Sequence, residues 1–150
     1  MKKYLWIVIV LVVINIVIYL LIPSLNKTKP LEYKTTTLTL SGEVFTTQIA
    51  DTGVLRERGL SYRNALSQNE AMLFVFEEPG KYLFWMKDMN FSIDIIWLDS
   101  SKHMIYVEKN LSPNTYPKAF GPDEQSQYVI EVSAGTFDRL RLHVGDQILF

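Results

Sequence analysis

The densest group of side chains that could carry out chemistry lies between Trp85 and Asp99. Trp85, Lys87 and Asp88 come first, and Asp94 follows inside an apolar stretch. Two carboxylates held near each other can serve as acid and base toward a glycosidic bond, or can hold a cation. A lysine and a tryptophan beside them can instead bind a ligand through charge and ring contact.

The chemistry depends on how two neighbouring segments, Tyr82–Met89 and Ile93–Leu98, pair as a hairpin. A two-residue loop places Lys87 opposite Asp94, which gives a stabilising cross-strand ion pair. A three-residue loop places Asp88 opposite Asp94 instead. Two facing carboxylates repel each other unless a cation, a proton or a basic group lies between them. Only the second register therefore favours a metal or acid–base site.

Each candidate residue also has a purely structural interpretation. Asp94 lies among isoleucines, so we expect it to be buried and paired with a basic side chain. Trp85 fits a hydrophobic core as well as a stacking surface for a sugar or a peptide. Arg58 could clamp a ligand carboxylate in a bidentate manner, or could tie its own helix to Asp94 or Glu131.

The sequence lacks the residues of several common reaction centres. It contains no cysteine, which excludes a thiol nucleophile, a thiolate metal site and a disulfide scaffold. The only histidines are His103 and His143, and neither has other ligands at the spacing of a zinc site. Phosphate-binding loops, dinucleotide fingerprints and nucleophile elbows are also absent from the sequence. We therefore expect no metal and no cofactor.

The N-terminal segment differs from the rest of the chain. Of the first 30 residues 20 are apolar, and 17 of these lie in the run Leu5–Ile22. As a helix this run is about 27 Å long, close to the hydrocarbon thickness of a bilayer, and no signal-peptide cleavage site follows it. We expect residues 1–23 to be a retained anchor that contacts the lipid bilayer through Leu5–Ile22, and residues 24–34 to be a short tether. The N-terminus would be cytoplasmic and the domain extracytoplasmic, because long C-terminal domains are translocated largely regardless of charge.

Residues 35–150 have the composition of a single globular domain. All 16 acids and 11 of the 15 bases lie beyond residue 30, so this part has a net charge of 11 − 16 = −5, which disfavours nucleic-acid binding. The pattern predicts an α+β, mainly β domain of about eight short strands and two short helices, preceded by one transmembrane helix. A small barrel or sandwich is the natural arrangement, because it limits exposed sheet edges.

Local signals place the expected elements along the domain. The first two strands form a hairpin, and the continuous apolar third strand should be central and buried on both faces. Gly53–Arg58 is a short helix with Asp51 and Thr52 as N-cap residues and Gly59 closing its end, and Thr136 caps a second helical turn. The proline-rich stretch Leu111–Ser126 is a long loop. The predicted strands are Thr35–Leu40, Val44–Ala50, Ala71–Phe76, Tyr82–Met89, Ile93–Leu98, Lys102–Glu108, Tyr128–Val132 and Gln147–Phe150.

Four blocks of sequence carry a family resemblance. They are ADTGVLRERGLSYR (Ala50–Arg63), AMLFVFEEPGKYLFWMKDMNFSIDIIWLD (Ala71–Asp99), the proline-rich loop with Tyr116-Pro117, and YVIEVSAGTFDRLRLHVGD (Tyr128–Asp146). In order and spacing they resemble the A-x-T…R-x-x-GLM-x-R, GMLFVF…FWMKNT-x-x-PLDIIFLD and YVLEL-x-AG…VGD patterns of the domain of unknown function 192 family of small prokaryotic proteins. The resemblance implies that a signal or anchor before the domain is usual, and it supplies no reaction.

These observations lead to two hypotheses about function. The first is a membrane-anchored, extracytoplasmic module of the cell envelope that binds an envelope protein or a small molecule without catalysis. The alternative is an envelope hydrolase that acts on a glycan through paired carboxylates. The ligand-binding candidates are Arg58, Trp85, Lys87 and Asp94, and the acid–base candidates of the hydrolase are Asp88, Asp94 and Asp99.

Overall fold

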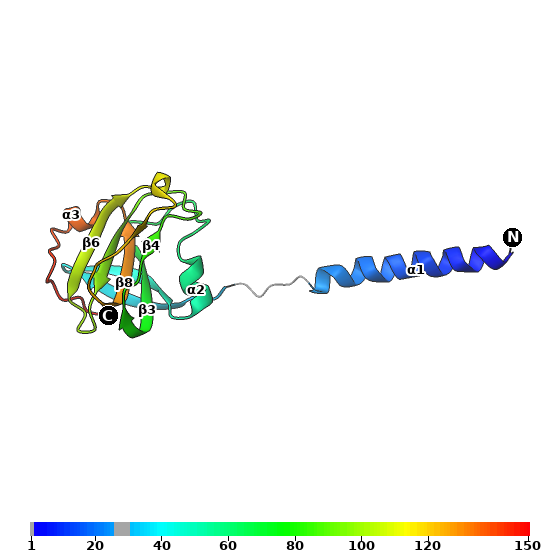
Figure 1. Ribbon diagram of the computed structural model, residues 1–150, viewed down its shortest axis with the longest axis horizontal. Coiled ribbons are helices and arrows are strands. Elements are labelled where there is room, and N and C mark those ends of the chain that lie inside the picture. The colour runs from blue at the N-terminus through cyan, green and yellow to red at the C-terminus, as the bar shows by residue number, and fades with distance from the viewer. Residues whose placement is uncertain (1, 26–30) are drawn as a thin grey trace. The chain divides into compact units, whose positions relative to one another are not determined.

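The chain divides into two compact units, Met1–Glu32 and Tyr33–Phe150. The computed structural model describes residues 2–25 and 31–150 (Figure 1). Within the first helix, side chains are described for residues 4, 6 and 7 and, without interruption, for residues 9–20.

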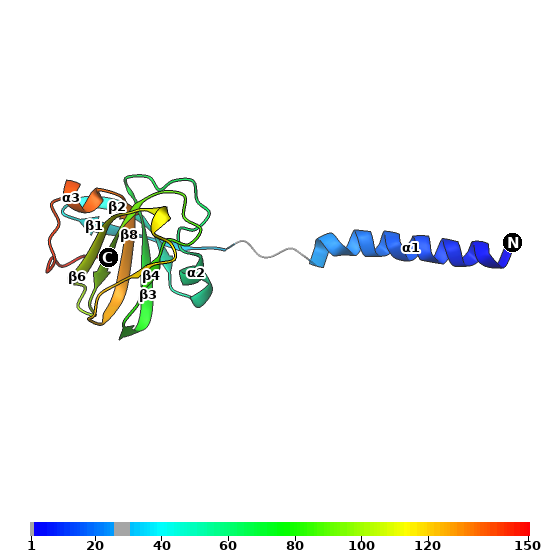
Figure 2. The same cartoon turned by 45° about the horizontal axis from the view of Figure 1, so that its top comes forward.

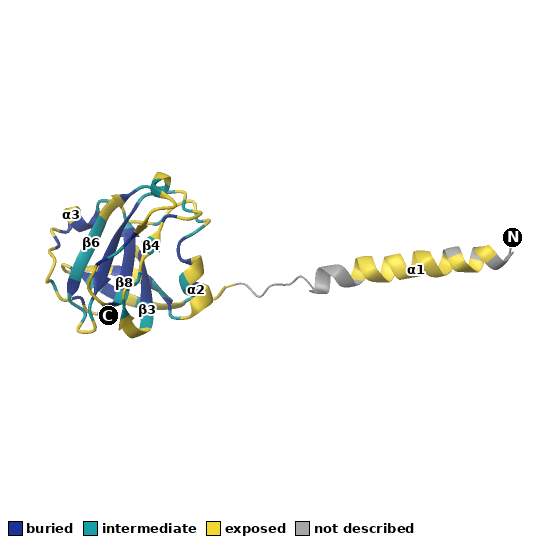
Figure 3. Ribbon diagram, viewed as in Figure 1, coloured by how far each residue is buried: buried dark blue, intermediate teal, exposed yellow. Residues whose placement is uncertain are grey.

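The first unit is the helix α1 (Lys2–Leu25), which continues two residues past the predicted end at Pro23. Its described side chains are all exposed (Figure 3). Among the residues whose side chains are described, which in α1 run without a break only over 9–20, no helix is long and apolar enough to cross a membrane. The central part of the predicted tether, residues 26–30, lies outside the described residues.

The described residues of the second unit form eight strands, two short α-helices and one 3-10 helix, which confirms a mainly β α+β domain. In chain order they are β1 (Lys34–Leu40), β2 (Glu43–Ala50), α2 (Gly53–Arg58), β3 (Glu70–Gly80), β4 (Phe84–Trp85), β5 (Ile93–Leu98), β6 (Met104–Leu111), η1 (Pro113–Thr115), β7 (Ala119–Phe120), β8 (Ser126–Ser133) and α3 (Thr136–Arg139).

Six of these strands form one sheet in the order β1-β2-β3-β8-β5-β6, of which β1, β2, β3, β8 and β6 are labelled in Figure 2. The strands β4 and β7 pair in a second, two-stranded sheet. The large sheet is not closed, because β1 and β6 are its two edges. The C-terminal segment lies between those edges: Thr39 N donates to Leu149 O (3.2 Å), and Ile148 N donates to Lys102 O (3.0 Å). The large sheet is therefore open and does not close into a barrel.

The large sheet has a hydrophobic cluster on each face, because alternate residues of a strand point to opposite sides. Leu73 and Ile130 belong to one cluster, and Phe74 and Val129 belong to the other. The predicted central strand, Ala71–Phe76, is part of β3 and lies inside the sheet with both faces covered. That prediction is confirmed.

Local predictions near the start of the domain are also confirmed. β1 and β2 pair as a hairpin with Leu40 opposite Glu43. In α2 the Oγ1 of Thr52 accepts from the N–H of Leu55 (3.3 Å), and Gly59 ends the helix with a φ of +48°. Both outcomes follow from capping and turn chemistry that involves only near neighbours.

The predicted hairpin of Tyr82–Met89 with Ile93–Leu98 is wrong. Of the first segment only Phe84–Trp85 is a strand, and it pairs with β7. The second segment is β5, whose two edges are already occupied by β6 and β8, so that Asp94 lies opposite Val132. Neither register considered for Asp94 is therefore formed.

Two predictions near the C-terminus also need correction. Thr136 is not a cap: it is the first residue of α3, and Gly135 before it offers no side chain for capping. Gln147–Phe150 is not a full strand and makes only isolated bridges, Gln147 with His103 and Leu149 with Thr39. The predicted loop Leu111–Ser126 contains η1 and β7.

Candidate functional site

Two surface loops bring Arg58, Trp85, Lys87 and Asp88 together. One loop follows α2 and the other follows β4. The backbone N–H of Tyr62 donates to the carbonyl of Asp88 (2.8 Å), which fixes one loop against the other. Tyr62 and Asp88 both have left-handed backbone conformations, with φ of +65° and +57°. Such a conformation is uncommon for tyrosine and persists only where the surroundings impose it.

The side chains form two contacting sets, one around Tyr62 and one around Trp85, and the sequence neighbours Asp88 and Lys87 connect the two sets. The guanidinium carbon of Arg58 lies 4.3 Å from the ring centroid of Tyr62. The Nζ of Lys87 lies 5.8 Å from the ring centroid of Trp85, and the rings of Trp85 and Tyr116 meet edge to face at 5.7 Å. We call these two sets together the aromatic strip; its members are Arg58, Tyr62, Asp88, Lys87, Trp85 and Tyr116.

The aromatic strip is exposed and carries more positive than negative charge. Residues Tyr62, Trp85 and Tyr116 are 59%, 52% and 46% exposed. Among the described residues, Arg58 and Lys87 form no ion pair with a carboxylate. Each cation is instead held near an aromatic ring, a contact that orders the side chain without neutralising its charge.

The single acid of the strip is engaged by a tyrosine. The hydroxyl of Tyr62 donates to Oδ2 of Asp88 (2.6 Å). This hydrogen bond, together with the negative charge of Asp88, raises the pKa of the Tyr62 hydroxyl, while Arg58 acts in the opposite direction. Asp88 thus orients Tyr62 and forms no pair with a second carboxylate of the candidate set.

Asp94 lies apart from the strip and is fully buried. Its Oδ1 accepts from the backbone N–H groups of Asn110 (2.8 Å) and Gly135 (3.1 Å), and its Oδ2 accepts from that of Phe137 (2.9 Å). The carboxylate therefore performs the capping of α3 that sequence inspection assigns to Thr136. This arrangement is structural: the negative charge is balanced by backbone donors rather than by Lys87 or Arg58.

Asp99 organises a tight turn at the end of β5. Its Oδ1 accepts from the backbone N–H groups of Ser101 (2.8 Å) and His103 (2.9 Å). The same oxygen lies 3.9 Å from Nδ1 of His103. Asp88, Asp94 and Asp99 consequently have three different sets of partners on different elements. Among the described residues, no three acidic or histidine side chains are grouped to hold a metal ion.

A buried acid that the sequence reasoning did not select is Glu131 on β8. It is 6% exposed, and among the described residues its buried Oε2 has no hydrogen-bond partner. Burial raises the pKa of the Glu131 carboxyl to about 8, although the positive charge of Arg63 opposes the rise. In the sequence Glu131 is a single acid within the apolar segment YVIEV, and this pattern is the same one that indicated a buried Asp94.

Glu131 lies in a row that crosses the sheet. In register, Gln48 lies beside Met72, and Met72 lies beside Glu131. The Nη2 of Arg63 donates to Oε1 of Gln48 (2.5 Å). The Arg63 guanidinium is thus bound to the neutral amide of Gln48. It is still close enough to Glu131, two strands away, for its charge to lower the pKa of that carboxyl. A neutral, protonated Glu131 is consistent with this choice of partner.

The comparisons with known proteins agree with this fold. A curated relative, a UPF0127 protein of Thermococcus sibiricus, is 31% identical over 114 residues, which cover 71% of this chain and 68% of that protein. A second UPF0127 protein, from Thermococcus kodakarensis, is 32% identical over 106 residues. The matched part covers 67% of this chain and spans 62% of that relative's own length.

Two solved structures share the architecture. A Sinorhizobium meliloti protein, named as a candidate transcription regulator, superposes with a TM-score of 0.74 at 28% identity, and the match covers 79% of this chain and 95% of that one. A Novosphingobium aromaticivorans protein of unknown function gives a TM-score of 0.72 at 25% identity, covering 83% and 90%. The family model of domain of unknown function 192, described as "Uncharacterized ACR", matches residues 36–150. The chain therefore belongs to the domain of unknown function 192 family.

Proposed function

We propose that this protein is a membrane-anchored, extracytoplasmic module of the cell envelope that binds a ligand through the aromatic strip and carries out no catalysis. The anchor part of the proposal is supported by the apolar run Leu5–Ile22, which is long enough in sequence to span a bilayer as a helix. The binding part is supported by the strip itself. The folded part has a net charge of −5, which argues against a nucleic-acid partner.

The observation that carries the binding proposal is the pair of cations Arg58 and Lys87, which form no ion pair among the described residues and are each held against an exposed ring. An anionic group of a ligand can pair with these cations without first displacing an internal carboxylate. The rings of Trp85 and Tyr116 offer apolar area and polar edges beside them. A cell-envelope polypeptide or a small molecule with a planar or apolar group next to an anionic group fits this surface.

The alternative, a glycan hydrolase acting through Asp88, Asp94 and Asp99, has less support. Glycosidases place two carboxyl groups on either side of the scissile bond, within about 5–10 Å of each other. Here Asp94 is buried with three backbone donors, and Asp88 and Asp99 have separate partners at the surface. Among the described residues, no hydrogen bond and no shared partner joins any two of these three carboxyl groups.

Site-specific photo-crosslinking tests the binding proposal. A photoreactive phenylalanine analogue replaces Tyr116 of the strip, and a matched control replaces Val144, which is also exposed but lies near the C-terminus. In cells expressing the full chain, we expect a discrete crosslinked product from position 116 only. The product should weaken about tenfold when Trp85→Ala or Lys87→Glu is added, because hot-spot residues dominate binding energy. Equal products from both positions, or no effect of these two changes, would contradict the proposal.

Protease accessibility tests the topology. Spheroplasts that express the full chain are treated with external protease, and the globular unit is followed with an antibody. We expect the unit to be digested in intact spheroplasts. Resistance to protease until the spheroplasts are lysed would place the unit inside the cell and contradict this part of the proposal.

A further inference from the structure

Asn15 is the only polar side chain in the apolar run Leu5–Ile22. It lies near the middle of α1, and it is exposed on the surface of the helix. We infer that α1 pairs in the membrane with α1 of a second copy of this chain, and that Asn15 fixes the register of that pair. This inference rests on the anchor part of the proposed function.

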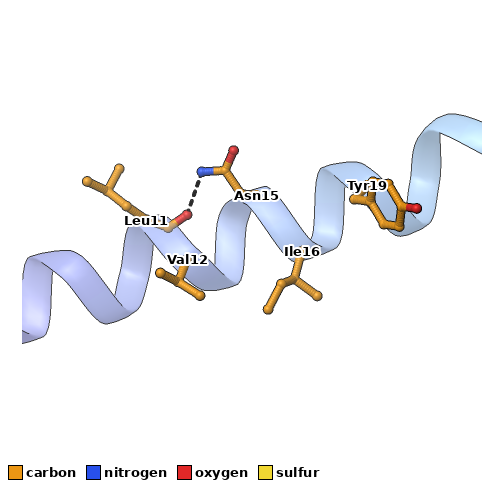
Figure 4. A pocket seen from close by; sticks show the side chains of 5 residues that line it. All are labelled: Leu11, Val12, Asn15, Ile16 and Tyr19. Atoms are coloured by element: carbon orange, nitrogen blue, oxygen red, sulfur yellow. Dashed lines mark hydrogen bonds between the residues drawn. The ribbon is translucent and has the colours of Figure 1, made fainter.

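The amide of Asn15 is only partly used within its own helix. Its Nδ2 donates to the backbone carbonyl of Leu11 (2.8 Å), as Figure 4 shows. An asparagine amide has a second N–H and a carbonyl oxygen with two lone pairs. The backbone N–H groups around it are already used in the helix, and among the described residues Oδ1 accepts no hydrogen bond. In hydrocarbon no water replaces the missing partner, and an unpaired polar group is costly there.

The surface around Asn15 can receive a second helix. The side chains of Leu11, Val12, Asn15, Ile16 and Tyr19 line a shallow hollow on one side of α1 (Figure 4). Their spacing of one, three and four residues places them on a single helix face. A single helix cannot enclose a cavity, so this hollow is an open contact surface. The other side chains lining it are largely apolar, and they would surround a buried amide pair.

A second copy of the chain fits this surface better than an unrelated helix. In two parallel copies the two Asn15 side chains lie at the same depth, and each can donate to the Oδ1 of the other in a symmetric pair. A lone asparagine in an apolar helix seam fixes both the register and the number of helices. An unrelated helix would need a polar group at the same depth.

The absence of cysteine from the sequence makes disulfide mapping possible with single substitutions. Leu11→Cys and Tyr19→Cys report on the proposed face, and Val10→Cys and Val17→Cys report on the opposite face. Each full-length variant is oxidised in native membranes, where a disulfide forms only when two Cα atoms approach within about 7 Å. We expect a product of twice the chain mass from the first pair of variants and none from the second pair.

Variants of Asn15 then test the role of the amide. In the Leu11→Cys background, Asn15→Leu should lower the yield of the dimer about tenfold, because the interhelical hydrogen bonds are lost. Asn15→Gln should retain most of it. The inference would be overturned if all faces crosslinked equally, if the product had the mass of a different partner, or if no product formed. It would also be overturned if Asn15→Leu had no effect on the yield.

Alkaline extraction of the same membranes separates this inference from the anchor proposal. If the chain is released into the soluble fraction, the anchor proposal fails and the paired helix fails with it. If the chain stays in the membrane but gives no face-specific crosslink, only the helix pair is refuted.

Discussion

Replacing Glu131 with glutamine should remove a pH dependence from the stability of this protein. Glu131 is buried on β8, its Oε2 has no partner among the described residues, and its pKa is raised to about 8 chiefly by burial. In the unfolded chain the carboxyl titrates near 4.5. Between these two values the folded state holds a proton that the unfolded state releases. Glutamine keeps the size of the side chain and is neutral at every pH.

The sign and size of the effect follow from linkage. The stability contributed by the neutral acid is fully present below a pH of 4.5 and is lost as the pH rises toward 8. Within that window the free energy of unfolding should fall by about 1.4 kcal/mol per pH unit. Over the whole interval the loss would be on the order of 5 kcal/mol, an upper bound because water can enter the site once the carboxyl is charged. The Glu131→Gln variant should lack this component of the slope.

Urea unfolding of the full chain in a non-ionic detergent, followed by tryptophan fluorescence, measures the slope. Wild type, Glu131→Gln and the exposed control Glu77→Gln are compared at several pH values between about 5 and 8. We expect the difference between wild type and Glu131→Gln to grow with pH, while Glu77→Gln follows wild type. A Glu131→Gln protein whose stability falls with pH as steeply as that of wild type would refute the reasoning.

Three further predictions concern single side chains. Asp94→Ala leaves three backbone N–H groups without an acceptor. The free energy of unfolding, measured by urea titration, should therefore fall by about 3 kcal/mol or more. A fall of less than about 1 kcal/mol would argue against the capping role of Asp94. Asp88→Asn removes the negative partner of Tyr62 and should lower the pKa of the Tyr62 hydroxyl toward its usual value. An ultraviolet titration of the tyrosines measures this pKa, and the absorbance change missing from Tyr62→Phe identifies the contribution of Tyr62. Gly59→Ala places a Cβ at a φ of +48° and 3.4 Å from a phenylalanine ring, and should cost about 1 kcal/mol or more in thermal unfolding. Gly53→Ala has open space and no positive φ, so it should cost little.

The parts of the fold that depend on near neighbours could be predicted from the sequence. The hairpin of β1 and β2 needs only a short turn between two alternating segments. The caps of α2 need only Thr52 and Gly59. The central position of β3 follows from its unbroken apolar run, since a strand covered on both faces has no polar side.

The partners of β5 could not be predicted in the same way. The assumption that Ile93–Leu98 pairs with the segment just before it is reasonable for short connections, because sequential strands are often neighbours. In the folded chain β8, which starts more than 25 residues later, takes one edge of β5 and β6 takes the other. The environment of Asp94 depends on that long-range pairing, since Gly135 and Phe137 reach it from 41 and 43 residues away.

Asp94 and Glu131 illustrate what the sequence leaves undetermined. Both are single acids within apolar strands, and their sequence signals are alike. In the structure Asp94 receives three backbone N–H groups, whereas the Oε2 of Glu131 receives none among the described residues. Backbone donors stabilise the charged form of a carboxyl group, whereas burial without such donors favours its neutral form. A response to pH is therefore to be sought at Glu131, while the aromatic strip remains the surface at which to seek a ligand.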